Sequence, residues 1–254
     1  MLFSLVRHAA SLLSRSDIVV MHHPRIANFS PQNQQRAQAI VPHIQFEPIE
    51  QPAFCNVALR SSAQSRRSAL LTLEAFRPRV RKYEKIVFLD ADMLCVNSFE
   101  DAVERADATV SAVPAGHYNL ANRSINTGFF ILRYDRIADG NAYRQLIDGV
   151  SQLTLTTWGL DQVVINQWIS EQAPSLDYLP HEYNLKSDGL GLFESPQTPV
   201  FNTFPRILHF CGSGVTKPWQ LVAGEKPKYP SAYGAWQNVA EQLHQTVEFE
   251  GSRE

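Results

Sequence analysis

The stretch Lys85-Ile-Val-Phe-Leu-Asp90-Ala91-Asp92 decides the fold. Its four consecutive apolar residues, 86–89, show no polar alternation, which is typical of a strand buried on both faces of a sheet. Short apolar runs of this kind alternate with helical patterns along the chain. The sequence therefore predicts an α/β fold with a mostly parallel central sheet flanked by helices.

The other expected elements follow from hydrophobic periodicity and from Gly and Pro positions. Further strands are expected at 18–21, 44–49, 107–113, 127–132 and 207–210. Helices are expected at 2–13, 32–41, 62–76, 98–105, 136–148, 160–170 and 232–245. Residues 180–230 have many Gly and Pro and little periodicity, so we expect a long loop region around a ligand site.

Two carboxylates follow the 86–89 strand, one residue apart. Alternate side chains of an extended chain point the same way, so Asp90 and Asp92 can face one ion together. Hard oxygen ligands of this kind suit Mg²⁺ or Mn²⁺, with diphosphate oxygens and water completing the coordination. The alternative is that D-x-D forms a turn or a helix start, where Asp is common.

A second group of polar residues follows the 207–210 strand. His209 ends the apolar run, Gly212 and Gly214 would let the backbone approach a ligand closely, and Lys217 could reach anionic oxygens. A neutral imidazole beside two carboxylates favours Mn²⁺ over Mg²⁺. The alternative is a core histidine bonded to backbone, followed by a surface lysine in a turn.

Two weaker signals lie between these groups. Asn126 and Gly128 open the 127–132 strand, and Asp161 with Gln162 opens the 160–170 helix. Each could contact a ligand. Asn126 could equally be a turn residue, and Asp161 could be an N-cap or a first-turn carboxylate favoured by the helix dipole.

Length and composition set further bounds. The 254 residues are 44% hydrophobic and 19% charged, which predicts one globular domain over 1–254. The net charge of 23 − 25 = −2 argues against nucleic-acid binding through bulk charge.

No apolar run has the roughly 18 residues of a transmembrane segment. Three cysteines in no paired pattern favour a reducing compartment, so we expect a cytoplasmic protein.

The order of these motifs resembles glycosyltransferase family 8, the glycogenin-like and galactosyltransferase-like enzymes. The motifs are KIVFLDADMLCVNSFEDAVE (85–104), NTGFFILR (126–133), GLDQVVINQWI (159–169), LPHEYN (179–184) and the H-F-x-G and K-P-W elements within 209–219. The resemblance implies a GT-A-type fold, a UDP-sugar donor, Mn²⁺ and transfer with retention at the anomeric carbon. It runs from about Arg67 to Trp219. The motif-bearing core is expected at 60–219, followed by a C-terminal helix and tail at 230–254.

The resemblance also implies roles for individual residues. Metal ligands would be Asp90, Asp92 and His209. Donor contacts would come from Arg67, Ala91, Asn126, Gly128, Gly212, Gly214 and Lys217. Asp161 and Gln162 would line the reactive face of the donor sugar. The H-F-x-G spacing is met by Gly212 and the G-x-x-K-P-W spacing by Gly214, so either glycine could contact the diphosphate.

One departure from the family pattern leaves alternatives open. Members usually begin with a strand and a loop that stack on uracil, and the sequence has no counterpart. Either the true start lies upstream, or the base is held differently, or the protein no longer binds nucleotide well. An unpaired sheet position also favours association, so a homodimer is an option.

The leading hypothesis is a metal-dependent retaining transferase that moves a hexose from a UDP-sugar to an acceptor. The acceptor could be a saccharide, polyol, lipid or protein. The alternative is a catalytically impaired binding or scaffold protein of the same fold. A nucleotidyltransferase would need a Gly-rich triphosphate loop near its N-terminus, and the sequence has none.

Overall fold

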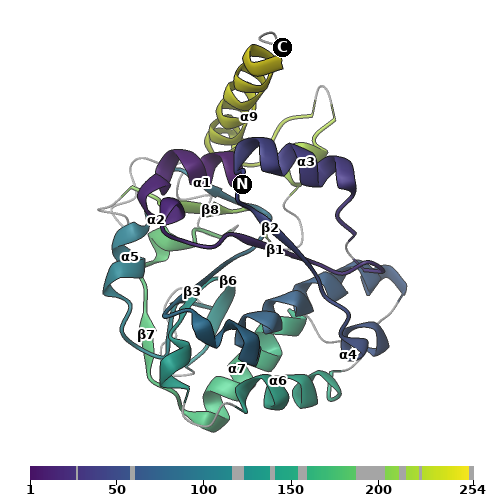
Figure 1. Cartoon of the computed structure of the whole chain (residues 1–254), viewed down its shortest axis with the longest axis vertical. Helices are drawn as coiled ribbons and strands as arrows, with labels where there is room; N and C mark the ends of the chain where they lie inside the picture. The colour runs from purple at the N-terminus through teal and green to yellow at the C-terminus, as the bar shows by residue number, and fades with distance from the viewer. Residues whose placement is uncertain are drawn as a thin grey trace. The chain divides into compact units, whose positions relative to one another are not determined.

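The computed structural model describes nine stretches of the chain, which Figure 1 shows in colour: 1–26, 28–57, 61–115, 123–137, 141–153, 159–186, 204–211, 216–222 and 225–251. The chain divides into two compact units. The first unit comprises Met1–Arg15, Asp90–Asp101 and Pro180–Glu254. The second unit comprises Ser16–Leu89 and Ala102–Leu179.

The second unit holds most of the strands. They are β1 (Val19–His22), β2 (Gln45–Pro48), β3 (Ile86–Leu89), β5 (Val110–Pro114), β6 (Ile125–Leu132) and β7 (Leu176–Tyr178). Its helices, with 3₁₀ helices labelled η, are α3 (Pro31–Ile40), α4 (Pro52–Asn56), η1 (Ser61–Phe76), η2 (Pro78–Lys82), η4 (Tyr134–Arg136), α6 (Ala142–Val150) and α7 (Leu160–Gln172).

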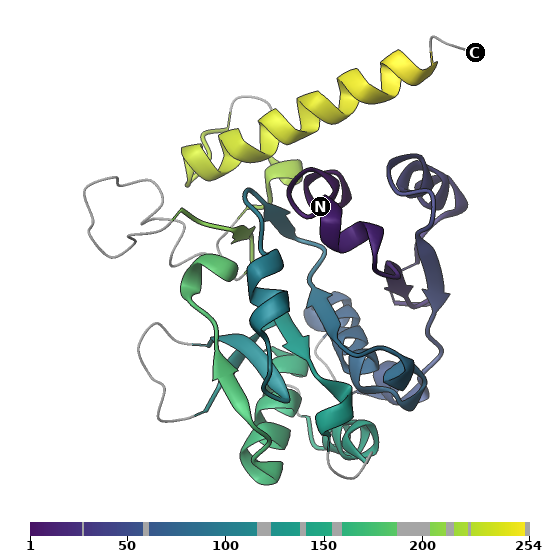
Figure 2. The ribbon, with the colours of Figure 1, turned by 60° about the vertical axis from the view of Figure 1, so that its left-hand side comes forward.

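The first unit is mainly helical. Its elements are α1 (Leu2–His8), α2 (Ala10–Ser14), β4 (Met93–Cys95), η5 (His181–Tyr183), β8 (Ile207–His209), η6 (Pro218–Gln220) and α9 (Pro230–Gly251). Helix α5 (Glu100–Arg105) crosses the boundary between the units. Figure 2 shows α9 as one long helix beside α1, and Arg7 of α1 donates a hydrogen bond to Gln242 of α9.

The sheets confirm the α/β class and correct the expected strand direction. The largest sheet has the order β3-β6-β5-β7, in which β6 runs antiparallel to both neighbours and only β5 and β7 are parallel. Strands β1 and β2 form a parallel pair, and β4 pairs antiparallel with β8. The expectation of a mostly parallel sheet is therefore wrong. Only ten residues, 115–124, separate β5 from β6, fewer than the dozen or more that a crossover between parallel neighbours needs.

The core of the second unit lies between this sheet and the helices η1, α6 and α7, which pack on one another. Phe130 of β6 is fully buried and contacts the rings of Phe76 and Phe88, with centroids 5.9 and 5.1 Å away. All four residues of β3 are only half-buried, so the expected burial on both faces is wrong. Among the described strands, β3 lies at the edge of its sheet, where one side lacks a neighbour.

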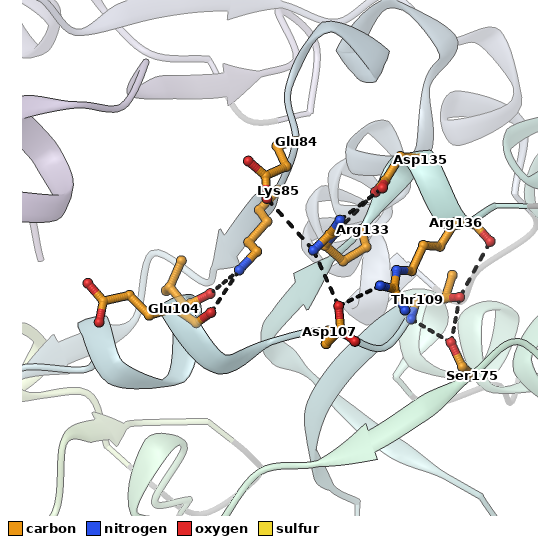
Figure 3. A network of polar contacts seen from close by, with 10 residues as sticks. Glu84, Lys85, Glu104, Asp107, Thr109, Arg133, Asp135, Arg136 and Ser175 are labelled. Carbon is orange, nitrogen blue, oxygen red and sulfur yellow. Dashed lines mark hydrogen bonds and ion pairs between the residues drawn. The ribbon is translucent and has the colours of Figure 1, made fainter.

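A polar network joins the ends of β3, β5 and β6 in the second unit (Figure 3). Arg133, just after β6, lies within ion-pair distance of Glu84, Asp107 and Asp135. Lys85 donates hydrogen bonds to the carbonyls of residues 103 and 104 at 2.7 and 3.0 Å, where α5 ends. A lysine at this place complements the free carbonyls of a helix C-terminus.

Several sequence-based expectations differ from the structure in detail. The 2–13 helix is broken at Ala9 into α1 and α2, and the 62–76 helix has 3₁₀ geometry. The short elements β4, β7 and α4 were not expected, because three to five residues carry too little periodicity to recognise. None of the described helices has the length and apolar character needed to cross a membrane.

Candidate functional site

The first unit brings Asp90, Asp92 and His209 together. One ligand atom from each lies within 4.8 Å of the others, and Nε2 of His209 is 3.1 Å from Asp92 and 3.5 Å from Asp90. The pairing of β4 with β8, which sets Met93 opposite His209, produces this arrangement. Residues 91–92 form a turn, so the extended-chain reason for the carboxylates to converge is wrong, although they do converge.

Charges in this cluster stabilise one another. Burial alone would raise the pKa of Asp92, but the imidazole of His209 and the ammonium of Lys217 outweigh it and hold the pKa well below its usual value. Burial likewise lowers the pKa of His209, but the nearby Asp92 and Cys211 outweigh it and raise the pKa to about 10. The site thus favours a positive charge between its carboxylates.

The residues fit a divalent cation. Nε2 of His209 is buried, yet it makes no hydrogen bond of normal geometry with any described residue. Nδ1 of the same ring lies 2.9 Å from Oδ1 of Asn184. Cis ligands of an octahedral cation held at roughly 2.1 Å lie roughly 3 Å apart, close to the spacings around Nε2. Two carboxylates and one imidazole are also the donor set expected for Mn²⁺.

Lys217 lies against the same cluster. Its ammonium contacts Oδ2 of Asp92 and the carbonyl of Phe210, and its side chain is 21% exposed. The sequence-based expectation placed it on a diphosphate, and the structure places its ammonium beside Asp92. Gly212 and Gly214, the two candidates for the diphosphate loop, lie outside the described residues.

The second unit brings Asn126 and Gln162 together. Nδ2 of Asn126 donates to Oε1 of Gln162 at 2.9 Å, and Oδ1 of Asn126 accepts from the backbone N–H of Gly128 at 3.1 Å. These bonds fix which end of each amide faces the other. Gly159, at the start of α7, has φ +60°, a left-handed conformation that suits glycine and sets the direction of the helix that carries Gln162.

Asp161 is turned inward. Asp161 is only 6% exposed, and its Oδ2 accepts a 2.6 Å hydrogen bond from the hydroxyl of Thr127. Burial raises its pKa, and hydrogen bonds from Thr127 and Thr72 offset part of that effect. In the structure this carboxylate connects α7 to β6 and η1 through hydrogen bonds.

Two further residues were expected at the donor. Arg67, on η1, is half-buried and donates from a terminal nitrogen to the carbonyl of Val57 at 2.6 Å, and its buried Nε has no partner among the described residues. Ala91 is exposed in the turn between the two carboxylates. The described residues show neither one bound to another candidate site residue.

Sequence reasoning missed Asn184 and Thr127 as members of these clusters. Both stand inside motifs that had been recognised, LPHEYN (179–184) and NTGFFILR (126–133). The available signal was only that each is a polar residue inside a recognised motif. Their partners, His209 and Asp161, are 25 and 34 residues away in sequence, so only the fold reveals the pairing.

Three comparisons with known proteins give the family and the fold of the chain. The model of glycosyl transferase family 8 matches residues 2–223. Glycogenin-1 of Oryctolagus cuniculus is 28% identical over 149 residues, which are 58% of this chain and 41% of that protein. Glycogenin-1 of Caenorhabditis elegans is 30% identical over 144 residues, 56% of this chain and 30% of that protein. The matched part thus spans about two fifths or less of these curated relatives.

Solved structures share the fold. The galactosyltransferase LgtC, crystallised with donor and acceptor sugar analogues, superimposes with a TM-score of 0.63 at 14% identity and covers 96% of this chain and 91% of its own. The glycosyltransferase GlyE of Streptococcus pneumoniae superimposes with a TM-score of 0.56 at 14% identity. The match covers 98% of this chain and 60% of the GlyE chain. The GT-A-type fold is confirmed, and the match over residues 2–223 shows that the chain belongs to glycosyl transferase family 8.

Proposed function

We propose that this protein is a metal-dependent retaining glycosyltransferase that moves a hexose from a UDP-sugar to an acceptor. The acceptor is a saccharide, polyol, lipid or protein. The observation that carries the proposal is the convergence of Asp90, Asp92 and His209 on one point, with Lys217 beside them. Membership of the family supports a nucleotide-sugar donor.

The cluster of Asp90, Asp92 and His209 would bind the diphosphate end of the donor. Asp90, Asp92 and His209 would hold Mn²⁺ or Mg²⁺, which when bound supplies Lewis-acid stabilisation of the charge on the departing UDP. Lys217 can exchange its contact with Asp92 for an anionic oxygen of the diphosphate, because its long side chain is partly exposed. The exposed backbone of Ala91 would lie near the ribose.

The sugar end of the donor would be bound by other residues. Asn126 and Gln162 would hold the hydroxyls of the hexose, with their amides oriented by the bonds between them and to Gly128. We assign Asp161 a supporting role, since its carboxylate already accepts the Thr127 hydroxyl. Arg67 remains a candidate donor contact, and its buried Nε, which has no partner among the described residues, supports that role.

The proposal is tested by incubating the full chain with a panel of UDP-sugars and Mn²⁺ and measuring UDP release. We expect release with at least one donor and its loss on adding EDTA. Asp92→Asn should abolish it. The matched control is Asp177→Asn, which changes an exposed carboxylate on β7 and should leave the rate unchanged.

A negative result would separate the two hypotheses. The transferase proposal would be overturned if no donor gave UDP release and if UDP caused no EDTA-sensitive shift in the melting temperature of the protein. Tight Mn²⁺-dependent UDP binding without release would instead favour the catalytically impaired binding protein.

A further inference from the structure

A fully buried amide faces the outer nitrogen of the candidate metal ligand His209. Asn184 is 0% exposed and His209 is 2% exposed, and Oδ1 of the amide lies 2.9 Å from Nδ1 of the ring. On the other side of the ring, Nε2 points at Asp90 and Asp92. The imidazole is thus held between one neutral polar group and two carboxylates.

The proton positions follow from what each nitrogen can do. A nitrogen that binds a cation must offer its lone pair, so Nε2 has to be unprotonated when the metal is bound. A neutral imidazole then carries its only proton on Nδ1. The amide oxygen of Asn184 can accept that proton, whereas an apolar side chain at this place would leave a buried N–H unpaired.

The backbone holds Asn184 rigidly beside strand β8. Its own N–H donates to the carbonyl of His181 at 3.0 Å. The next residue, Leu185, donates to Ile207 at 2.9 Å and accepts from the N–H of His209 at 2.9 Å. The amide and the ring are therefore carried by two chain segments bonded directly to each other.

We propose that Asn184 is a positioning residue that keeps the imidazole proton on Nδ1 and turns Nε2 of His209 toward the two carboxylates. This inference concerns the metal site of the proposed function, and its relevance to catalysis rests on that function. Partners of this kind orient ligating histidines, and their loss typically weakens metal binding by about 10- to 100-fold.

The first test measures Mn²⁺ affinity of the full chain by titration calorimetry at one fixed pH. Asn184→Leu removes the acceptor at similar size and should weaken binding about 10- to 100-fold. Asn184→Asp keeps an oxygen in place, cannot present an N–H, and should bind within a few-fold of the parent or more tightly. Equal affinity for the leucine variant, or an aspartate variant as weak as the leucine variant, overturns the proposal.

The matched control is Asn97→Leu. Asn97 lies in the same unit and donates from its amide to the carbonyl of Pro205 at 2.7 Å, so the change removes a comparable polar contact away from His209. We expect its Mn²⁺ affinity to match that of the parent. An equal loss in this variant would mean that general destabilisation, rather than the contact with His209, explains the effect.

A second measurement does not need the metal. Nitrogen-15 histidine NMR of the parent in EDTA should show a proton on Nδ1 of His209 that exchanges slowly, with His209→Gln used to assign the signal. The proton should persist in Asn184→Asp and exchange rapidly in Asn184→Leu. Its absence from the parent overturns the inference even if the leucine variant fails to fold. If the parent binds no Mn²⁺ but the NMR pattern holds, the proposed metal function fails and the positioning role stands.

Discussion

Asp92 and Asp161 carry the same carboxyl group in opposite surroundings. Asp92 sits beside His209 and Lys217, which lower its pKa, so it stays ionised and available to a cation. Asp161 is enclosed by protein, and burial raises its pKa. In the proposed function the first carboxylate binds a cation, whereas the second accepts a hydrogen bond from Thr127 within its own unit.

The role of Asp161 predicts a pH-dependent effect of Thr127→Val. A carboxyl whose pKa rises above 3.8 on folding contributes stability below that value and loses it as pH rises through the folded pKa. Removing the Thr127 hydroxyl raises that pKa further, so the penalty should grow with pH, reaching about 1–3 kcal/mol when the group is ionised. Urea unfolding at pH 5 and pH 8 measures this.

Thr127→Ser is the matched control, because it keeps the hydroxyl that donates to Asp161. It should show a smaller and nearly pH-independent loss. A valine penalty of equal size at both pH values would contradict the assignment of the hydrogen bond to an ionisable partner.

Lys217 should compete with the cation for Asp92. Lys217→Ala removes an ammonium from Oδ2 of Asp92, so Mn²⁺ affinity without nucleotide should rise roughly two- to fivefold, the range for a partly exposed ion pair. Affinity for UDP in the presence of Mn²⁺ should fall, because a diphosphate contact is lost. Calorimetry with each ligand separates the two effects.

Lys226→Ala controls for net charge, since Lys226 is exposed in the same unit. Neither affinity should change in that variant. Weaker Mn²⁺ binding by Lys217→Ala would show that Lys217 supports the cation rather than competing with it.

At the scale of elements, the start of α7 decides where Gln162 lies. Gly159 adopts φ +60° immediately before the helix, and the following turn carries both Asp161 and Gln162. A residue with a Cβ would be strained in this conformation by roughly 1–2 kcal/mol. The glycine therefore sets the direction in which the helix leaves the preceding segment.

Gly159→Ala should lower the free energy of unfolding by roughly 1–2 kcal/mol and weaken donor binding, because relief of the strain shifts the first turn of α7. Gly234→Ala is the matched control. Gly234 lies inside α9, where an added Cβ meets no atom within 4 Å, so the change should stabilise the protein by roughly 0.5–1 kcal/mol. Urea unfolding and titration with the UDP-sugar measure both variants. A Gly159→Ala variant as stable as the parent would contradict the glycine's role.

For the whole molecule, the chain passes between its two units at residues 15–16, 89–90, 101–102 and 179–180. Neither unit is one continuous segment, because segments of each unit are separated in the chain by segments of the other. If residues 1–254 form one domain, as the sequence predicts, both units should unfold in one cooperative transition.

We expect core variants in either unit to shift one shared transition. Phe130→Ala in the second unit and Phe210→Ala in the first each remove a fully buried ring, which costs roughly 3–5 kcal/mol. Far-UV circular dichroism and tryptophan fluorescence should give coincident unfolding curves in both variants. Separate transitions, each moved by only one variant, would show two independently stable units.

The correct predictions from sequence came from patterns within short segments of the chain. The apolar run 86–89, the polar residues that follow it and the periodicity of 160–170 depend on neighbours in the chain, so strand, carboxylates and helix could be located. The α/β class and the family followed from the order of such segments. Elements of three residues, such as β4 and β7, carried no recognisable period.

Only the tertiary structure decided how those segments pair. Strand direction depends on chain reversals that periodicity does not encode, which is why β6 proved antiparallel to its neighbours. The inward turn of Asp161 and the contact of Asn184 with His209 arise from register between segments distant in sequence. A sequence specifies which residues can ligate a cation, but the surrounding packing fixes their protons and orientation, because burial and hydrogen-bond partners are set by the whole fold.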